Sequence, residues 1–200
     1  MTRFARSLAP LALLAVTAPA IAQQFSQSYE FLKAIRDEDG QKVTEILNEP
    51  GTTVVNARDR STGDGALHII ARSRNTTYLR FLLQKGANPN LQDARGNTPA
   101  LIAVETRFTD GIDTLILYKA NLNLANRSGE TPLIRAVQLR DVDMVRRLLA
   151  AGANPDQADV IAGMSARDYA RRDARSPALL KLIEDAPKRG TSGQASGPKR

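Results

Sequence analysis

One pattern in this chain combines turn residues with the start of an apolar run, and it occurs three times. The three copies are GANPNLQDARGNTPALIA, KANLNLANRSGETPLIRA and GANPDQADVIAGMSARDY. They begin at residues 86, 119 and 152, which places them 33 residues apart. A turn-then-helix pattern that recurs at a fixed interval predicts a stack of similar units, because such periodicity is the signature of repeat architectures.

The alignment of these copies also brings the hydrophobic positions into register. Helix starts are expected at Gly65, Thr98, Thr131 and Met164, and the first helices then share the column Leu67, Ala100, Leu133 and Ala166. The second helices share three apolar columns, which are Leu79, Ile112 and Val145, then Leu82, Leu115 and Leu148, then Leu83, Ile116 and Leu149. Such i, i+3, i+4 spacing predicts amphipathic helices.

The turn residues between these helices have physical reasons to be there. Threonine in Thr98-Pro99 and Thr131-Pro132 predicts an N-cap, and proline then takes the first helical position, where its missing N–H costs nothing. Gly86 and Gly152 follow the second helices, where a left-handed residue ends a helix. Each unit has an apolar face that it cannot bury alone, so the units must stack.

These motifs resemble a known family. The segments TPLIRAV (131–137), GALHIIA (65–71) and LLAAGANPD (148–156) are similar to the ankyrin repeat, whose signature includes T-P-L-H-x-A at a period of 33. The resemblance covers residues 29–185. It implies an all-α repeat, an ankyrin-type α-solenoid of helix–turn–helix units with projecting β-hairpin-like loops. It also implies a concave surface, made of loop tips and first helices, that binds proteins.

The unit boundaries follow from this alignment. We expect an N-terminal capping unit at 29–55, repeats at about 56–89, 90–122 and 123–155, and a C-terminal capping unit at 156–185. Phe31, Ile35, Val43, Ile46 and Leu47 match the apolar columns at the N-terminal end, and Leu179, Leu182 and Ile183 close the stack. A short lead at 23–28 precedes the domain, and a flexible basic tail at 186–200 follows it.

The first 22 residues predict a signal peptide. Arg3 and Arg6 precede an apolar stretch, and Ala20 to Ala22 supply the small residues for cleavage between Ala22 and Gln23. A membrane anchor or a core helix is the alternative, but the apolar stretch is too short for a hydrocarbon layer of ~30 Å. The expected destination is export, to the periplasm.

Composition excludes several kinds of function. The chain has no Cys and one His, which argues against thiol chemistry, metal centres and His-based catalysis, so we expect no enzyme, metal or cofactor. His68 occupies the histidine position of the family signature, which implies a structural role. The formal charge of +7 is concentrated at the ends of the chain. Without Arg3, Arg6, Lys188, Arg189, Lys199 and Arg200, 22 basic residues face 21 acidic ones, so nucleic acid is not an expected partner.

The resemblance also implies which positions contact a partner. They are the loop tips and the exposed ends of the first helices. Here these positions hold Arg72, Ser73, Arg95, Asn97, Glu105, Thr106, Arg127, Glu130, Gln138, Leu139, Val160, Ile161 and Arg171. This set is mixed in charge, with Leu139 and Ile161 as apolar anchors, which suits a protein partner.

Three arginines stand where the family usually has glycine after the first helix. Arg74, Arg107 and Arg140 lie 33 residues apart, so stacking would align them in a column. One hypothesis is a ladder that binds an acidic partner through planar guanidinium groups. The alternative is that each arginine is solvated and caps carbonyls of its first helix.

The second full unit departs most from the pattern. Lys119 replaces the capping glycine, and Gly111 falls inside a helix, where it costs about 1 kcal/mol relative to alanine. We therefore expect segment 107–121 to be the least stable part of the stack. Native-state hydrogen exchange tests this prediction, and protection equal to that of 142–150 would contradict it.

Three functions compete at this stage. The leading hypothesis is an exported monomeric scaffold that binds an unidentified protein through its concave face, with no small-molecule substrate. A second is an envelope-tethered protein, held to an anionic surface by the four basic residues of its tail, each worth about 1 kcal/mol near a membrane. The third, an enzyme of unknown type, is disfavoured because few catalytic groups are present.

Overall fold

The computed structural model describes residues 18–173 and 175–187. The body of the predicted signal peptide and residues 188–200 of the predicted tail lie outside this part. The helices of the described residues are α1 (Ala18–Arg36), α2 (Gly40–Asn48), η1 (Val54–Asn56, a 3-10 helix), α3 (Ala66–Ser73), α4 (Thr76–Gln84), α5 (Pro99–Glu105), α6 (Thr109–Leu117), α7 (Pro132–Gln138), α8 (Val142–Ala150), α9 (Ala166–Arg172) and α10 (Pro177–Glu184).

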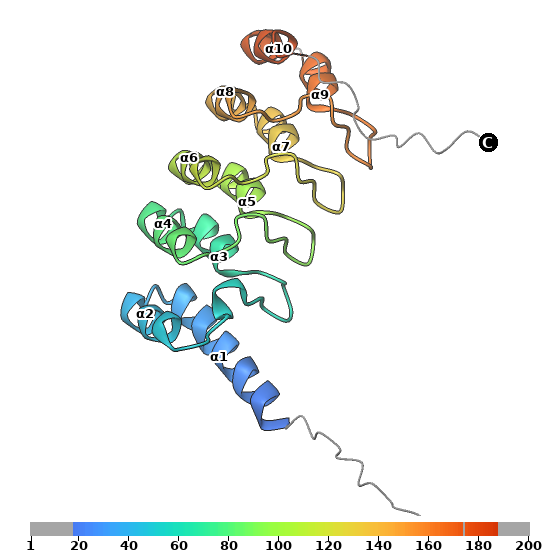
Figure 1. Cartoon of the computed structure of the whole chain (residues 1–200). Helices are drawn as coiled ribbons and strands as arrows, with labels where there is room; N and C mark the ends of the chain where they lie inside the picture. The colour runs from blue at the N-terminus through green and yellow to red at the C-terminus, as the bar shows by residue number, and fades with distance from the viewer. Residues whose placement is uncertain (1–17, 174, 188–200) are drawn as a thin grey trace, which may run out of the picture.

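The helices form pairs, and the pairs stack in one direction (Figure 1). Odd-numbered helices pack in sequence, α1 on α3, α3 on α5, α5 on α7 and α7 on α9. Even-numbered helices form the second layer, and four loops project on the side of the odd-numbered helices (Figure 1). The loops are hairpin-like in path, but within the described residues β-pairing is limited to one bridge, between Ala158 and Ser165. The predicted all-α solenoid is confirmed.

The aligned apolar columns form the core. Two columns of the second helices are completely buried, and they comprise Leu79, Ile112, Val145, Leu82, Leu115 and Leu148. In the third column Leu83 is buried, while Ile116 and Leu149 are partly buried against the same core. Burial of one such side chain stabilises the fold by about 1.5–3 kcal/mol, so these columns hold the stack together.

The terminal units complete the core as expected. Phe31, Ile35 and Val43 are fully buried between α1 and α2, and Ile183 on α10 is fully buried at the other end. Helix α1 is longer than the other first helices and extends past the stack (Figure 1). The expected lead at 23–28 is therefore helical, and the expected cleavage point between Ala22 and Gln23 falls within α1.

The helix start predicted at Met164 is wrong by one residue. Ser165 is the N-cap of α9, and its hydroxyl accepts a hydrogen bond from the N–H of Asp168. The preceding loop is one residue longer than the loop before α7. Its Asp159 N–H donates to the carbonyl of Met164, five residues on, whereas Asn126 N–H in the loop before α7 donates to the carbonyl of Glu130, four residues on. Arg167, and not Ala166, therefore occupies the column of Leu133.

Four basic residues end helices in a left-handed backbone conformation. Arg74, Arg107 and Arg140 have φ of 57°, 53° and 53°, and Lys119 has 62°. Glycine adopts this conformation without strain, which explains why glycine is usual at these positions. The three aligned arginines therefore occupy the left-handed position of the backbone turn as well as a position on the surface.

The structure supplies a packing reason for Gly111, which the sequence analysis treated only as a weak point of α6. A Cβ atom at this position would lie 2.2 Å from Cδ1 of Phe108, whose ring is buried. Phe108 precedes α6 and packs over the first turn of the helix, so glycine makes room for the ring.

We predict that Gly111→Ala destabilises the protein, although alanine is the better helix former. Overpacking against the buried ring costs about 1–3 kcal/mol, while helix propensity returns about 1 kcal/mol. Urea unfolding measures the difference. The double variant Gly111→Ala/Phe108→Leu serves as control and recovers part of the loss if the ring is the cause. A Gly111→Ala protein more stable than the parent would contradict the packing argument.

Candidate functional site

We define the inner face as the surface made by the odd-numbered helices and the four loops at 57–65, 86–98, 119–131 and 152–165. Each loop is built around one polar side chain that accepts hydrogen bonds from its own backbone. The acceptors are Asp59, Asp93, Asn126 and Asp159, one in each loop. In chain order, the N–H groups that donate to them are those of Ser61 and Thr62, of Arg95 and Asn97, of Ser128 and Glu130, and of Ile161 and Ala162. Each of these side chains is thus engaged by the backbone of its own loop.

These interactions affect the acidity of the loop carboxyls. Burial raises the pKa of Asp93, but hydrogen bonds from Asn97 and from the N–H of Arg95 outweigh it, so the pKa lies below its ordinary value. The pKa of Asp159 is lowered in the same way, since donors that include the hydroxyl of Tyr169 outweigh burial. Both groups are therefore ionised at neutral pH and hold their loops in shape.

Neighbouring loops are joined through their backbones. Ala94 N–H donates to Thr62 O at 2.9 Å, Arg127 N–H to Arg95 O at 2.9 Å, and Val160 N–H to Ser128 O at 3.0 Å. One hydrogen bond thus connects each loop tip to the one before it. The four tips therefore form a continuous edge, which we call the loop edge.

His68 belongs to this framework. It is fully buried, its Nδ1 accepts from Gly65 N–H at 3.0 Å, and its Nε2 donates to the carbonyl of Asn97 at 2.9 Å. The imidazole thus links the start of α3 to the next loop. The structural role expected for His68 is confirmed.

We predict that the stability of the fold decreases as the pH falls below about 6.5. Burial lowers the pKa of His68 below that ordinary value, so the unfolded chain binds a proton that the folded chain refuses. The contribution of neutral His68 to the free energy of unfolding is complete above pH 6.5. As the pH falls from 6.5 to the pKa of His68 in the folded protein, the free energy of unfolding decreases by about 1.4 kcal/mol per pH unit.

Urea unfolding at pH 7.5 and 5.5 measures this dependence. The control is His68→Leu, because Leu101 and Ile134 hold the equivalent positions in the next two units. Glu130, whose pKa burial raises, titrates in both proteins and cancels in the comparison. An equal pH dependence in the two proteins would show that His68 is not the cause.

Two of the expected contact residues are not on the surface, which corrects the sequence analysis. Asn97 is 4% exposed and Glu130 is 8% exposed. The amide of Asn97 donates to Asp93 and accepts from Asn126, and Glu130 pairs with Arg135 at 2.9 Å. These side chains support the loops and do not project from them.

Several other expected contacts have structural partners. Arg72 forms a two-bond pair with Asp64 at 2.8 and 3.0 Å, and the hydroxyl of Thr106 donates to the carbonyl of Ala71. Leu139 is only partly exposed and packs against the core, so it is a poor apolar anchor. Gln138, Arg171 and Ser73 are exposed, although Arg171 also pairs with Glu184 at 3.4 Å.

The other exposed residues of the expected contact set differ in chemistry from one loop tip to the next. Arg95 and Arg127 occupy the tips of the second and third loops and are exposed. Val160 and Ile161 occupy the tip of the last loop and are 73% and 80% exposed. Ile161, expected as an apolar anchor, is exposed, and its contact with a partner stays a prediction. The inner face is thus cationic at its middle tips and apolar at its last tip.

A hollow of about 330 Å³ lies under the two central tips. Arg95 and Arg127 line it from the loops, and Glu105 and Arg135 line it from α5 and α7. Arg135 contacts Glu105 at 3.1 Å as well as Glu130, so it joins two consecutive units. The sequence analysis missed Arg135, whose position inside the first helix did not mark it as a contact residue.

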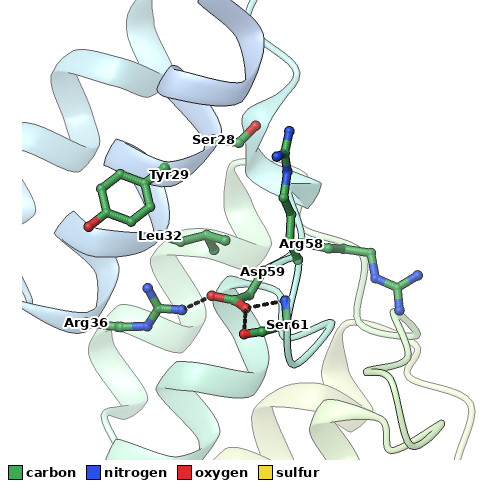
Figure 2. A pocket seen from close by; sticks show the side chains of 8 residues that line it. Ser28, Tyr29, Leu32, Arg36, Arg58, Asp59 and Ser61 are labelled. Carbon is green, nitrogen blue, oxygen red and sulfur yellow. Dashed lines mark hydrogen bonds and ion pairs between the residues drawn. The ribbon is translucent and has the colours of Figure 1, made fainter. Parts of the chain in front are cut away.

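A second hollow of about 370 Å³ lies at the N-terminal end of the inner face, between α1 and the first loop (Figure 2). Tyr29 and Leu32 line it from α1, and Arg58 and Asp59 line it from the loop. Arg36 pairs with Asp59 at 2.5 Å, as Figure 2 shows. The sequence analysis missed this hollow, because it depends on how closely the first loop and α1 approach each other in the fold.

The three aligned arginines do not behave alike. Arg140 pairs with Asp173 and, through that hydrogen bond, lowers the pKa of the carboxyl to about 2. Arg107 donates to the carbonyl of Leu139 in the next unit at 3.5 Å, and Arg74 is exposed. A uniform ladder of available guanidinium groups is therefore not present, and the capping that does occur links one unit to the next.

The described residues offer little for other kinds of site. No group of His, Asp and Glu residues within 18–173 and 175–187 could hold a metal ion. Over the same residues, no helix is long and apolar enough to cross a membrane.

The repeated helix pairs and joined loops define a class, the all-α repeat solenoid. Comparison with known proteins identifies the family. A family model described as ankyrin repeats (3 copies) matches residues 31–126 and 67–159, which together exceed half of the chain. The chain belongs to the ankyrin repeat family.

Two curated proteins are similar to part of the chain. The nuclear factor NF-kappa-B p110 subunit of Drosophila melanogaster is 36% identical over 63 residues, 32% of this chain and 6% of that protein. The oxysterol-binding protein homolog 1 of Saccharomyces cerevisiae is 33% identical over 73 residues, 35% of this chain and 6% of that protein. The chain therefore matches only a small part of either relative, 6% of its length in both cases.

Proposed function

We propose that this protein is an exported scaffold that binds another protein through its inner face and carries out no chemistry of its own. Ankyrin repeats are in general protein-interaction modules, and no catalytic family is indicated. The observation that carries the proposal is the edge of loop tips, which hydrogen bonds join into one unit while side chains such as Arg95 and Ile161 stay exposed. A rigid exposed edge favours binding because little side-chain and loop freedom remains to be lost.

Export is the second part of the proposal and rests on the leader sequence. Mass spectrometry of the protein from its host would find Gln23 as the first residue if the leader is removed there. An N-terminus at Met1 in the cytoplasmic fraction would refute export and leave the binding proposal intact.

Crosslinking in the cell followed by capture and mass spectrometry tests the binding proposal. The inner-face variant is Arg95→Ala/Gln138→Ala/Ile161→Ser. The matched control, Arg80→Ala/Gln84→Ala/Leu117→Ser, changes the same kinds of exposed residue on α4 and α6. We expect a protein captured by the parent and the control to be lost by the inner-face variant. Equal capture by all three would refute the proposed surface.

A truncation at residue 187 tests the tethering alternative. This end point keeps Ala186, whose carbonyl accepts a hydrogen bond from Arg167 at 3.2 Å, so the last helix retains its partner. Binding that disappears with residues 188–200 and with added salt would favour electrostatic tethering by the basic tail. Capture that survives the truncation supports the inner face.

A further inference from the structure

Along the loop edge, acidic side chains of two loops are buried, whereas basic side chains are exposed. Asp93 and Asp159 are buried, 5% and 7% exposed, and accept hydrogen bonds from their own loops. The arginines at the tips of the second and third loops, Arg95 and Arg127, are exposed, whereas Arg58 of the first loop donates to the carbonyls of Gly63 and Gln92. The face that a partner meets is therefore more cationic than the nearly neutral sequence indicates.

Arg95 and Arg127 are the two guanidinium groups best placed for a ligand. They stand on adjacent tips that the Arg127 N–H to Arg95 O hydrogen bond holds together, and they line the same hollow. Within the described residues, neither side chain has an ion-pair or hydrogen-bond partner in the protein. Two guanidinium groups at the rim of one hollow create a site for anionic groups, since arginine recognises carboxylates in planar, two-bond geometry.

The floor of the hollow does not supply that anion itself. Glu105 and Glu130 are both held by Arg135, at 3.1 and 2.9 Å. Glu130 is also 8% exposed, and this burial raises its pKa. The two carboxylates are therefore engaged below, and the rim arginines remain available for a partner.

The last loop ends this cationic stretch with apolar residues. Val160 and Ile161 follow Asp159, whose carboxylate fixes the tip through the N–H groups of Ile161 and Ala162 and through the hydroxyl of Tyr169. These two large aliphatic side chains are exposed to water, which is unfavourable, and they do not stabilise the monomer. They provide a contact for an apolar residue of a partner.

We infer that the partner presents an extended acidic segment, with carboxylates between Arg95 and Arg127 and an apolar side chain on Val160 and Ile161. This inference rests on the proposed function and names the chemistry of the partner. Packed helices lie about 8–10 Å apart, and an extended chain advances about 3.3–3.6 Å per residue. Acidic residues about three positions apart, followed after a similar interval by an apolar residue, therefore match successive loop tips.

Selection from a random 12-residue peptide phage library on the protein (residues 23–200) tests the inference. Selection on the variant Arg95→Gln/Arg127→Gln runs in parallel, and both proteins carry the same basic tail, so the effect of the tail cancels. We expect Asp and Glu to be enriched at intervals of about three on the parent alone. Enriched peptides without acidic residues would overturn the inference while leaving the binding proposal intact.

Fluorescence anisotropy with the most enriched peptide then measures each contribution. We expect Arg95→Gln/Arg127→Gln to weaken binding by about 10-fold and to reduce its dependence on salt. The matched control Arg80→Gln/Arg146→Gln, exposed arginines of α4 and α8, leaves the affinity unchanged. We expect Ile161→Ser to weaken binding of the selected peptide. The same substitution leaves the affinity unchanged for a second peptide in which serine replaces the apolar residue. Equal losses in the arginine variant and its control would overturn the assignment.

Two further probes separate other anionic ligands. A peptide with phosphoserine in place of the acidic residues tests whether the same arginines prefer a phosphate to a carboxylate. Phosphatidylglycerol vesicles test a lipid surface. Tight binding to vesicles, lost in Arg95→Gln/Arg127→Gln, with no acidic peptide selected, would replace the acidic segment by a membrane. Selection of no peptide, together with no inner-face partner in the crosslinking experiment, would instead refute the proposed function.

Discussion

Replacement of Arg167 by alanine is expected to lower the free energy of unfolding by about 3–5 kcal/mol, the usual cost of removing one partner from a buried ion pair. Arg167 lies on α9 at the core-facing position that Leu133 occupies in the preceding unit, and its side chain is 5% exposed. It pairs with Asp156 at 2.7 Å and donates to the carbonyls of Ile183 and Ala186 at 2.5 and 3.2 Å.

These bonds give Arg167 two functions at once. It donates to the carbonyls of Ile183 and Glu184 at the C-terminal end of α10, and through its pair with Asp156 it ties α10 to the loop before α9. Alanine removes both functions and leaves a cavity. We therefore expect α10 to separate from the stack before the remaining units unfold.

Urea unfolding and hydrogen exchange of residues 177–184 check this prediction. Arg171→Ala is the matched control, because Arg171 lies on the same helix but is half-exposed in its pair with Glu184, and surface pairs contribute about 0–1 kcal/mol. Arg167→Leu restores the volume without the hydrogen bonds. A leucine variant as stable as the parent would show that packing, and not the ion pair, is what this position requires.

Gly129→Ala is expected to lower the free energy of unfolding by about 3 kcal/mol, from backbone strain and overpacking together. Gly129 has φ of 76°, a left-handed conformation that alanine adopts only with strain. An added Cβ would also lie 2.5 Å from Val160 N, the atom whose N–H donates to Ser128 O and joins the third loop to the fourth.

Gly86→Ala separates the two contributions. Gly86 has φ of 87°, but nothing lies within 4 Å of an added Cβ, so this variant measures the backbone strain alone. We expect it to cost about 1–2 kcal/mol. The excess in Gly129→Ala then measures the close approach of the two loops, and urea unfolding of both variants gives the difference. Equal losses would contradict a contribution from the contact.

The sequence by itself predicted the repeat, the helix pairs and most of the core. Its apolar columns predicted buried residues such as Leu82, Leu115 and Leu148 because burial on one helix face follows from spacing alone. The same reasoning failed at α9, where one extra loop residue moved the N-cap from Met164 to Ser165. A helix start depends on which backbone hydrogen bonds the loop closes, and a period cannot supply that information.

The candidate surface was predictable only in part. The resemblance to ankyrin repeats, carried over position by position, placed Arg95, Arg127 and Ile161 on the exposed surface, and all three are exposed. It could not show that Asn97 and Glu130 turn inward, because that choice depends on partners in adjacent units, such as Asn126 and Arg135.

The sequence thus determined the architecture, since hydrophobic periodicity and turn residues act locally and repeat in every unit. The tertiary structure alone decided which charges are exposed on the inner face. Carboxylates such as Asp93 are taken up by backbone N–H groups, whereas the guanidinium groups of Arg95 and Arg127 extend beyond the loops. A nearly neutral set of residues becomes a cationic edge because hydrogen bonds within and between units select which side chains are buried.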